Sequence, residues 1–244
     1  MKAVLLRQCL RFGLDLFFPR HCIHCAAPVE AGDFLYLCAH CRASVEYIRE
    51  PCCITCGYPF WGQMVSSRHC PKCRDLEPVF DGGRSLFMHR GAGATLIHCL
   101  KYQNGTFLGA DLQQMLYVCE PWLRRLGPIQ VVPVPLHPRR ERERGYNQSV
   151  WIARQLTEFL PRAVLNPCLI RRRDTETQTR LGAEERRENM KNAFAIRPKA
   201  VLDADQTYLI VDDVLTTGST LNACARTLSS EGVKQLKVFT LAHG

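Results

Sequence analysis

Residues 208–220 read YLIVDDVLTTGST, an apolar run that ends in two adjacent acids and continues into hydroxyls and a glycine. The run from Tyr208 to Val211 has the length and composition of a buried strand. The turn that follows suits an anion, because backbone N–H groups at the start of the next helix can converge on a negative charge. A ligand that carries hydroxyls at one end and a phosphate nearby would use both features.

The division between acids and hydroxyls predicts how such a ligand lies. Two carboxylates would repel a phosphate, so Asp212 and Asp213 must face another part of the ligand, and ribose hydroxyls are natural donors to them. The stretch therefore predicts a ribose 5-phosphate site, although a chance strand–turn–helix with acids at its end is the competing reading. The phosphate would be held by Thr216, Thr217, Gly218, Ser219 and Thr220.

The chain after Pro78 alternates between expected strands and helices. This alternation predicts an α/β fold with a doubly wound, mostly parallel sheet, which binds ligands beyond the carboxyl ends of its strands. We expect strands at 85–89, 129–134, 209–211 and 233–241, and helices at 94–102, 107–119, 147–160 and 220–230.

Four C-x-x-C turns lie between residues 21 and 74. Each turn points two thiolates at one ion, and two turns complete a closed tetrahedral zinc site. Four turns in about fifty residues therefore predict two structural Zn²⁺ ions. The expected ligands are Cys22, Cys25, Cys38, Cys41, Cys53, Cys56, Cys70 and Cys73.

The spacing leaves the pairing of these turns open. Sequential pairing gives C-x2-C-x12-C-x2-C and then C-x2-C-x13-C-x2-C, whereas a cross-brace would join the first turn with the third. Redox chemistry is typical of a single C-x-x-C motif that opens a helix, which is not the pattern here. Cys53 is favoured over Cys52 because it has the two-residue gap to Cys56. Supporting or solvent-facing roles are expected for His24, His40 and His69.

The composition bounds the class of protein. The chain has 244 residues, 46% of them hydrophobic, with 14 cysteines and a net charge of +9. The charge favours polyanionic partners. Residues 1–20 are interrupted by charged and polar side chains and lack the apolar core of a signal peptide, so we expect an amphipathic segment, no transmembrane segment and a cytoplasmic protein. The expected divisions are 1–20, a double zinc ribbon at 21–77 and the α/β domain at 78–244.

The chain resembles the ComF family. Residues 209–220 are similar to the phosphoribosyl-pyrophosphate signature of type I phosphoribosyltransferases, and four zinc knuckles precede that domain, as in the family. Further segments that match the family are Leu100-Lys101-Tyr102, Val132-Pro133-Val134-Pro135-Leu136, Arg144-Gly145-Tyr146-Asn147-Gln148 and residues 171–194.

The resemblance implies roles for particular residues. Asp212 and Asp213 would be the catalytic acids, holding the ribose hydroxyls of phosphoribosyl pyrophosphate and influencing its Mg²⁺ ion. The segment from Leu136 through His137 to Arg139 would lie where this superfamily binds pyrophosphate, with Arg140, Arg142, Arg144 and Lys101 as further cations. Residues 171–189 would form a hood over the substrate. A solvated helix face explains the run of arginines and glutamates at 139–144 almost equally well.

The resemblance leaves two classes of function open. The chain could be a phosphoribosyltransferase of unknown acceptor, in which pyrophosphate leaves the anomeric carbon. It could instead be a binding module, because ComF proteins are associated with natural transformation: one that handles single-stranded DNA together with other DNA-uptake proteins, or one that senses phosphoribosyl pyrophosphate. Arginines near Tyr146 and Trp151 would suit a stacking groove for DNA.

Overall fold

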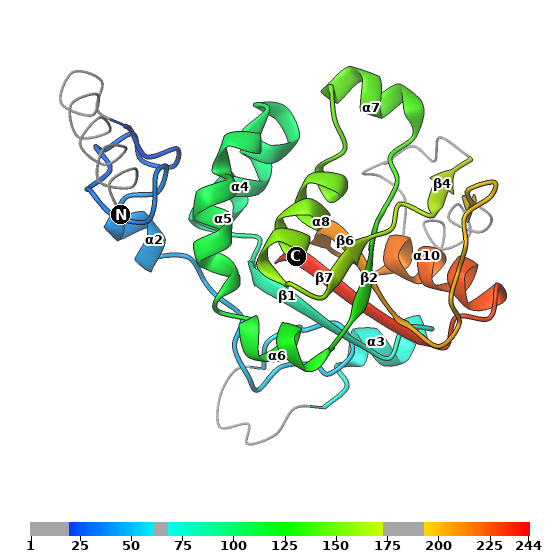
Figure 1. Ribbon diagram of the computed structural model, residues 1–244. Coiled ribbons are helices and arrows are strands. Elements are labelled where there is room, and N and C mark those ends of the chain that lie inside the picture. The colour runs from blue at the N-terminus through cyan, green and yellow to red at the C-terminus, as the bar shows by residue number, and fades with distance from the viewer. Residues whose placement is uncertain (1–19, 61–67, 173–192) are drawn as a thin grey trace.

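A computed structural model describes residues 20–60, 68–172 and 193–244 of the chain (Figure 1). The expected amphipathic segment at the N-terminus and most of the expected hood lie outside these residues. The helices are α2 (Ala39–Ala43), α3 (Pro71–Leu76), α4 (Gly91–Tyr102), the 3₁₀ helix η1 (Gly105–Leu108), α5 (Gly109–Leu116), α6 (Glu120–Arg125), α7 (Pro138–Arg144), α8 (Gln148–Phe159) and α10 (Ser219–Ser230).

The strands form one large sheet and one small one. A five-stranded sheet has the order β1-β7-β6-β2-β3, and all its neighbouring pairs are parallel. A separate antiparallel pair joins β4 and β5. These findings confirm the α/β, mostly parallel fold expected from the alternating pattern. The bounds are β1 (Gly82–Met88), β2 (Ile129–Pro133), β3 (Ala163–Leu165), β4 (Leu169–Arg171), β5 (Phe194–Ile196), β6 (Thr207–Leu215) and β7 (Gln235–His243).

Both faces of the large sheet are covered by helices, which is why most residues of β1, β2, β6 and β7 are buried. Leu209 and Val211 of β6 belong to the core on the side of α4, α5 and α8. The alternate residues Tyr208 and Ile210 belong to the core on the side of α10. Figure 1 shows α4 and α5 on one side of the sheet and α10 on the other.

Strand β6 is longer than the sequence pattern predicted. The expected strand stopped at Val211, with the two acids beyond it. In the structure the strand continues to Leu215, and Asp212 pairs with Thr240 of β7. Backbone pairing with β7 does not depend on side-chain polarity, so an acidic pair does not end the strand. The acids therefore stand on a rigid element instead of a loop.

The helix expected at 107–119 is also different. The 3₁₀ helix η1 covers Gly105–Leu108, and α5 ends at Leu116. Gly105 packs so closely on α4 that a Cβ atom there would lie 2.8 Å from the Leu100 nitrogen. This contact brings the chain into a tight turn before the longer helix begins. None of the helices in the described parts of the chain is both long and apolar enough to cross a membrane.

Candidate functional site

The acidic pair lies where β6 has lost one of its two neighbours. Strand β2 ends at Pro133, opposite Val211, and from there to Leu215 the residues of β6 pair with β7. Asp213 is buried and Asp212 is partly buried. The side of β6 that β2 leaves free is therefore where the acids can meet a ligand, at the carboxyl end of the sheet.

The first turn of α8 holds both acids in position. Gln148 Nε2 donates a hydrogen bond to Asp213 Oδ2 at 3.0 Å, and Ser149 Oγ donates one to Asp212 Oδ1 at 2.9 Å. The helix is capped by Asn147, whose side chain accepts from the Ser149 N–H group. Sequence reasoning matched Gln148 to the family without giving it a role, and it missed Ser149. The signal that could have found them is a run of polar residues on the core side of a helix start.

Lys101 forms an ion pair with Asp213. It lies in the last turn of α4, and its Nζ atom is 3.2 Å from Asp213 Oδ1. The sequence had placed it among the candidates for pyrophosphate binding. The structure brings it to the acids, where its charge can also reach an anion bound beside Asp213.

Two of the segments that carried the family resemblance contact each other. The Tyr146 hydroxyl donates a hydrogen bond to the Leu100 carbonyl, and the Arg144 guanidinium lies 5.5 Å from the centre of the Tyr102 ring. These contacts join the start of α8 to the end of α4. Residues 100–102 and 144–149 thus form one support around the acids, although more than forty residues separate them.

Asp212 ionises less readily than an ordinary aspartate. Burial raises the pKa of Asp212 to about 7, and the adjacent charge of Asp213 acts in the same direction. The Ser149 hydroxyl, the Asp213 N–H group and Lys101 lower that pKa by smaller amounts. At neutral pH Asp212 therefore exchanges readily between its protonated and ionised forms, as expected for two carboxyl groups that share one site.

The hydroxyl-rich turn enters α10 through a left-handed residue. Gly218 has φ +75° and occupies the N-cap position, a conformation that favours glycine. Thr217 Oγ1 lies 3.0 Å from Ser219 Oγ and accepts from the Ser219 N–H group at 3.4 Å. Among the described residues, no acceptor is found for the backbone N–H groups of Thr216, Thr217 and Gly218. These groups remain available to an anion at the positive end of α10.

The residues expected to bind pyrophosphate lie on the loop after β2 and on α7. His137 is the N-cap of α7 and accepts from the Arg139 N–H group at 3.4 Å. Arg139 pairs with Glu143 at 3.0 Å, one turn further on, and no residue of α7 is buried. Leu136 lines a hollow of about 270 Å³ together with Asn147 and other residues of this loop, α7, α8 and β4. Arg144, at the end of α7, belongs to the support around the acids through its contact with Tyr102.

The eight knuckle cysteines form two groups of four. Cys22, Cys25, Cys38 and Cys41 make one group, and Cys53, Cys56, Cys70 and Cys73 make the other, with the sulfur atoms of each group within 4.8 Å of one another. Sulfur pairs such as Cys25–Cys38 (3.6 Å), Cys53–Cys73 (3.9 Å) and Cys56–Cys70 (3.7 Å) have the spacing of a tetrahedron. Zn–S bonds of about 2.3 Å require sulfurs about 3.8 Å apart. The residues fit two Zn²⁺ ions, and the pairing is sequential, not cross-braced.

Neighbouring cysteine and histidine residues take the supporting roles expected of them. Cys52 is buried outside both groups and belongs to a small cluster with Ile48 and Met88. The ring of His24 contacts the Thr95 hydroxyl at 2.8 Å, and the ring of His69 contacts the Thr55 hydroxyl at 2.7 Å. Both interactions tie a knuckle to its surroundings without adding a ligand to the metal group.

The two zinc sites contact different parts of the α/β domain. The first site packs into the core beside α4 and α5. Its loop also donates backbone N–H groups from Leu35 and Tyr36 to Asp111, at 2.7 and 3.0 Å. The second site packs against the core below α10. A Cβ atom on Gly57 of this site would lie 2.7 Å from the Ser85 nitrogen in β1. Each ribbon is therefore built onto the domain through specific backbone contacts.

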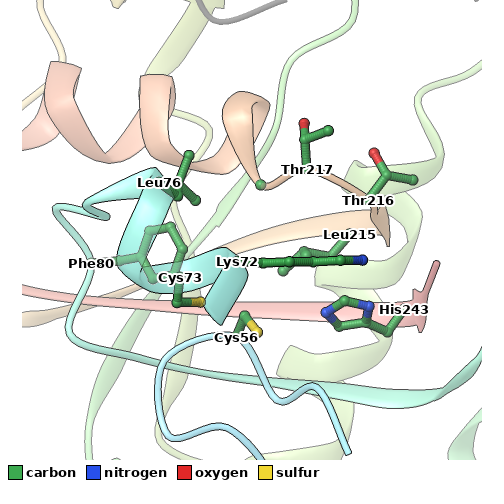
Figure 2. A pocket seen from close by; sticks show the side chains of 10 residues that line it. Cys56, Lys72, Cys73, Leu76, Phe80, Leu215, Thr216, Thr217 and His243 are labelled. Carbon is green, nitrogen blue, oxygen red and sulfur yellow. The ribbon is translucent and has the colours of Figure 1, made fainter. Parts of the chain in front are cut away.

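The second zinc site reaches the hydroxyl-rich turn. Figure 2 shows a small pocket that Cys56 and Cys73 of this site line together with Leu215, Thr216 and Thr217. A Cβ atom on Gly218 would lie 2.7 Å from Leu76 Cδ2 in α3. The sequence had placed Gly218 among the residues that would hold the phosphate. The structure shows in addition that the turn rests on the second ribbon, where a side chain at this position would collide with Leu76.

Two family models match this chain, and they describe its two halves. A double zinc ribbon domain matches residues 13–74, and a phosphoribosyl transferase domain matches residues 152–244. The first range contains both metal groups. The second contains the acids and the hydroxyl-rich turn but begins after Gln148 and Ser149, which hold the acids.

Curated relatives match nearly the whole chain. Competence protein F of Haemophilus influenzae is 32% identical over 86% of this chain and 98% of its own length. DNA utilization protein YhgH of Salmonella typhimurium is 31% identical over 93% of this chain and 99% of its own. Competence protein ComFC of Streptococcus pneumoniae is 25% identical, covering 87% and 90%. The similarity thus extends across the zinc ribbons and the α/β domain together.

Proposed function

This chain belongs to the ComF family, and from this membership we propose that it binds phosphoribosyl pyrophosphate with Mg²⁺ at residues 212–220. The acids accept hydrogen bonds from the ribose hydroxyls, and the turn from Thr216 to Thr220 holds the 5-phosphate. One observation carries the proposal. Near the end of β6 stand two carboxylates that Gln148 and Ser149 hold in place, and the turn directly after the strand has N–H groups without an acceptor among the described residues.

The arrangement suits a ligand that carries hydroxyl groups at one end and a phosphate at the other. Asp213 is held by Lys101 and Gln148, so its oxygens are fixed before a ligand arrives. Three residues later the chain offers N–H groups and hydroxyls at the start of a twelve-residue helix. A bare anion would need only the second feature, and a bare cation only the first. A phosphorylated sugar uses both, which is why we favour it over simpler ligands.

The chemistry that follows is displacement at the anomeric carbon. The bond from that carbon to pyrophosphate breaks and its electron pair leaves with pyrophosphate, while an acceptor atom forms the new bond and gives its proton to solvent. Hard oxygen ligands such as the two carboxylates suit Mg²⁺, and the ion would neutralise the leaving group. Lys101, which pairs with Asp213, and Arg144, which contacts the Tyr102 ring next to Lys101, would help to stabilise the same charge.

The acceptor would enter from the hollow beside α8. This hollow is lined by Leu136, Asn147, Val150 and Arg171, among other residues. Its volume of about 270 Å³ is close to the lower end of small-molecule sites. Asn147 immediately precedes Gln148, so the hollow and the acids share the start of α8. The lining combines apolar side chains with Glu141, Asn147, Arg171 and Arg197, which suits an acceptor that has both apolar and polar groups.

The proposal is tested with the purified, zinc-loaded protein. Calorimetric titration with phosphoribosyl pyrophosphate and Mg²⁺ measures binding, and release of pyrophosphate measures turnover with nucleobases or single-stranded DNA as acceptors. Binding with turnover supports a transferase. Binding without turnover supports a sensor of the same ligand. Absence of binding would overturn the assignment of this site.

Binding is expected to weaken as the pH falls through about 7. Asp212 must be ionised to accept hydrogen bonds from the sugar, and its raised pKa means that protonation begins near neutrality. A group that must lose a proton to bind contributes at most a tenfold change per pH unit, a limit reached only well below its pKa, so we expect about a fivefold loss between pH 7 and pH 6. Isothermal titration across this range measures the effect.

The control is the Asp212→Asn variant, which cannot ionise. It should bind more weakly at pH 8 and show a flatter pH profile than the wild type. Phosphate groups of the ligand also titrate near pH 6, and the variant reports this contribution separately. A wild-type profile that matches the variant's in slope would contradict a role for Asp212 ionisation.

A second candidate is binding of single-stranded DNA, favoured by the exposure of α7. This helix carries Arg139, Arg140, Arg142 and Arg144, and none of its residues is buried. The aromatic residues that we considered for base stacking do not support the idea. Tyr146 donates its hydroxyl to the Leu100 carbonyl, and Trp151 packs against the core. The charges of α7, and not a stacking platform, would therefore carry such binding.

DNA binding by α7 should depend steeply on salt. Each phosphate contact on a single strand contributes about 0.7 to the slope of log K against log salt concentration. Arg142→Gln should therefore reduce that slope by about this amount. Arg226→Gln on α10 removes an exposed arginine elsewhere and should leave the slope unchanged. Fluorescence anisotropy with an unstructured oligonucleotide gives both slopes, and equal slopes for the two variants would reject the α7 site.

A further inference from the structure

We propose that Lys72 of the second zinc ribbon is an anion-binding residue of the hydroxyl-rich turn. In this inference, which rests on the proposed function, its ammonium group binds the 5-phosphate of phosphoribosyl pyrophosphate. The ribbon is then one wall of the ligand site as well as a support for the fold.

Lys72 projects from the start of α3 into the pocket beneath the turn. The pocket is lined by residues of both parts of the chain, including Lys72, Thr216, Thr217 and Gly218. Figure 2 shows the Lys72 side chain extending below Thr216 and Thr217, with its nitrogen on the side of Thr216 and His243. Lys72 and the residues of the hydroxyl-rich turn therefore line one pocket.

The charge balance of this pocket requires a cation. A phosphate dianion at the start of α10 meets N–H groups and hydroxyls, which neutralise only part of its charge. Burial, together with the nearby Lys72 charge, lowers the pKa of His243 to about 4, so that ring is neutral at physiological pH. Among the ten residues that line the pocket, Lys72 is therefore the one that carries a positive charge.

Lys72 is also held where it can act. Its Nζ atom lies 5.4 Å from the centre of the Tyr58 ring, a cation–π contact within the same ribbon. No ion pair with a described acid is found for it, in contrast to Lys101, which pairs with Asp213. A cation that is not held in an ion pair with a carboxylate can bind an incoming anion without first breaking such a salt bridge.

The floor of the pocket provides a second, independent sign of a polar occupant. His243 is fully buried, its Nδ1 atom contacts the Gly244 carbonyl, and its Nε2 atom has no hydrogen-bond partner in the described parts of the chain. Buried polar atoms are nearly always satisfied by protein or by bound molecules. An oxygen atom seated in this pocket, from a ligand or from a water beneath it, would satisfy Nε2.

The test compares Lys72→Met with Arg74→Met by calorimetric titration in the full-length, zinc-loaded protein. The two residues flank Cys73 on either side, are both exposed, and only the first lines the pocket. Lys72→Met should weaken both phosphoribosyl pyrophosphate and ribose 5-phosphate about tenfold, the size of effect expected for one charge-assisted contact. Arg74→Met should bind both like the wild type, and Lys72→Arg should recover most of the affinity.

Several outcomes would overturn the inference. One is a Lys72→Met variant that binds both ligands like the wild type. Another is a loss confined to phosphoribosyl pyrophosphate, because the residue would then contact pyrophosphate. Equal losses in the two methionine variants would indicate a general effect of charge. Zinc content must remain at two ions per chain in each variant, which separates lost contact from a lost ribbon. If the wild type binds neither ligand, the proposed function fails as well.

Discussion

Replacement of Asp213 by asparagine or alanine is expected to weaken binding of phosphoribosyl pyrophosphate by about tenfold to hundredfold. A hydrogen bond to a charged group contributes roughly 1.5–3 kcal/mol, and each 1.4 kcal/mol corresponds to about tenfold in affinity. Asp213 is buried and held by Lys101 and Gln148, so no neighbouring water-exposed acid can take its place. Calorimetric titration in the presence of Mg²⁺ measures the loss.

The sign of this effect distinguishes a sugar contact from a merely basic anion site. In a basic anion site, removing an acid would release Lys101 and tighten the binding of a polyphosphate. The matched control is Asp205→Asn, which removes an exposed acid before the other end of β6, 3.7 Å from Lys234. That variant should bind like the wild type. Tighter binding by the Asp213 variants would reject the assignment of the acids to the sugar.

Loss of the second zinc ion should be more damaging than loss of the first. Structural zinc supplies about 10–16 kcal/mol of apparent binding free energy in small ribbons, most of it as folding free energy. Cys56→Ser should therefore unfold the second ribbon and remove the surface on which Gly218 and the hydroxyl-rich turn rest. We expect one zinc ion per chain and no measurable binding of phosphoribosyl pyrophosphate.

Cys25→Ser provides the comparison, because the first site packs beside α4 and α5 and not beside the turn. This variant should also retain one zinc ion but keep most of its affinity for the ligand. Metal analysis and calorimetry on the same samples give both numbers. Normal binding by a Cys56→Ser protein that contains one zinc ion would show that the turn does not need the ribbon.

Much of the fold could be predicted because its signals are local. The C-x-x-C turns predicted two zinc sites from spacing alone, and the alternation of apolar segments predicted the parallel sheet. The predicted end of β6 was wrong because Asp212 and Asp213 interrupt the apolar run in the sequence, whereas the backbone continues to pair with β7. The pairing of the zinc turns was undecidable because both arrangements give four thiolates per ion, and only the three-dimensional positions separate them.

The site was less predictable because its contacts join distant parts of the chain. The acids and the turn stand in one motif, so the sequence could nominate them. Gln148 and Ser149 support the acids across more than sixty residues, and Leu76 meets Gly218 across more than one hundred and forty. The hydrophobic periodicity of a sequence gives no signal for contacts between such distant residues. Lys72 was overlooked for the same reason, since within its knuckle it looks like an ordinary exposed lysine.

The order of strands in the sheet has a consequence for the protein during its synthesis. β1 is the first strand to be made, but its neighbour in the sheet is β7, the last. At about 5–20 residues per second, β1 waits roughly 7–30 s for that partner. Residues 46–48 bond to one edge of β1 meanwhile, but the other edge stays open. Nascent chains paused before residue 235 should therefore bind chaperones and aggregate more readily than the finished protein.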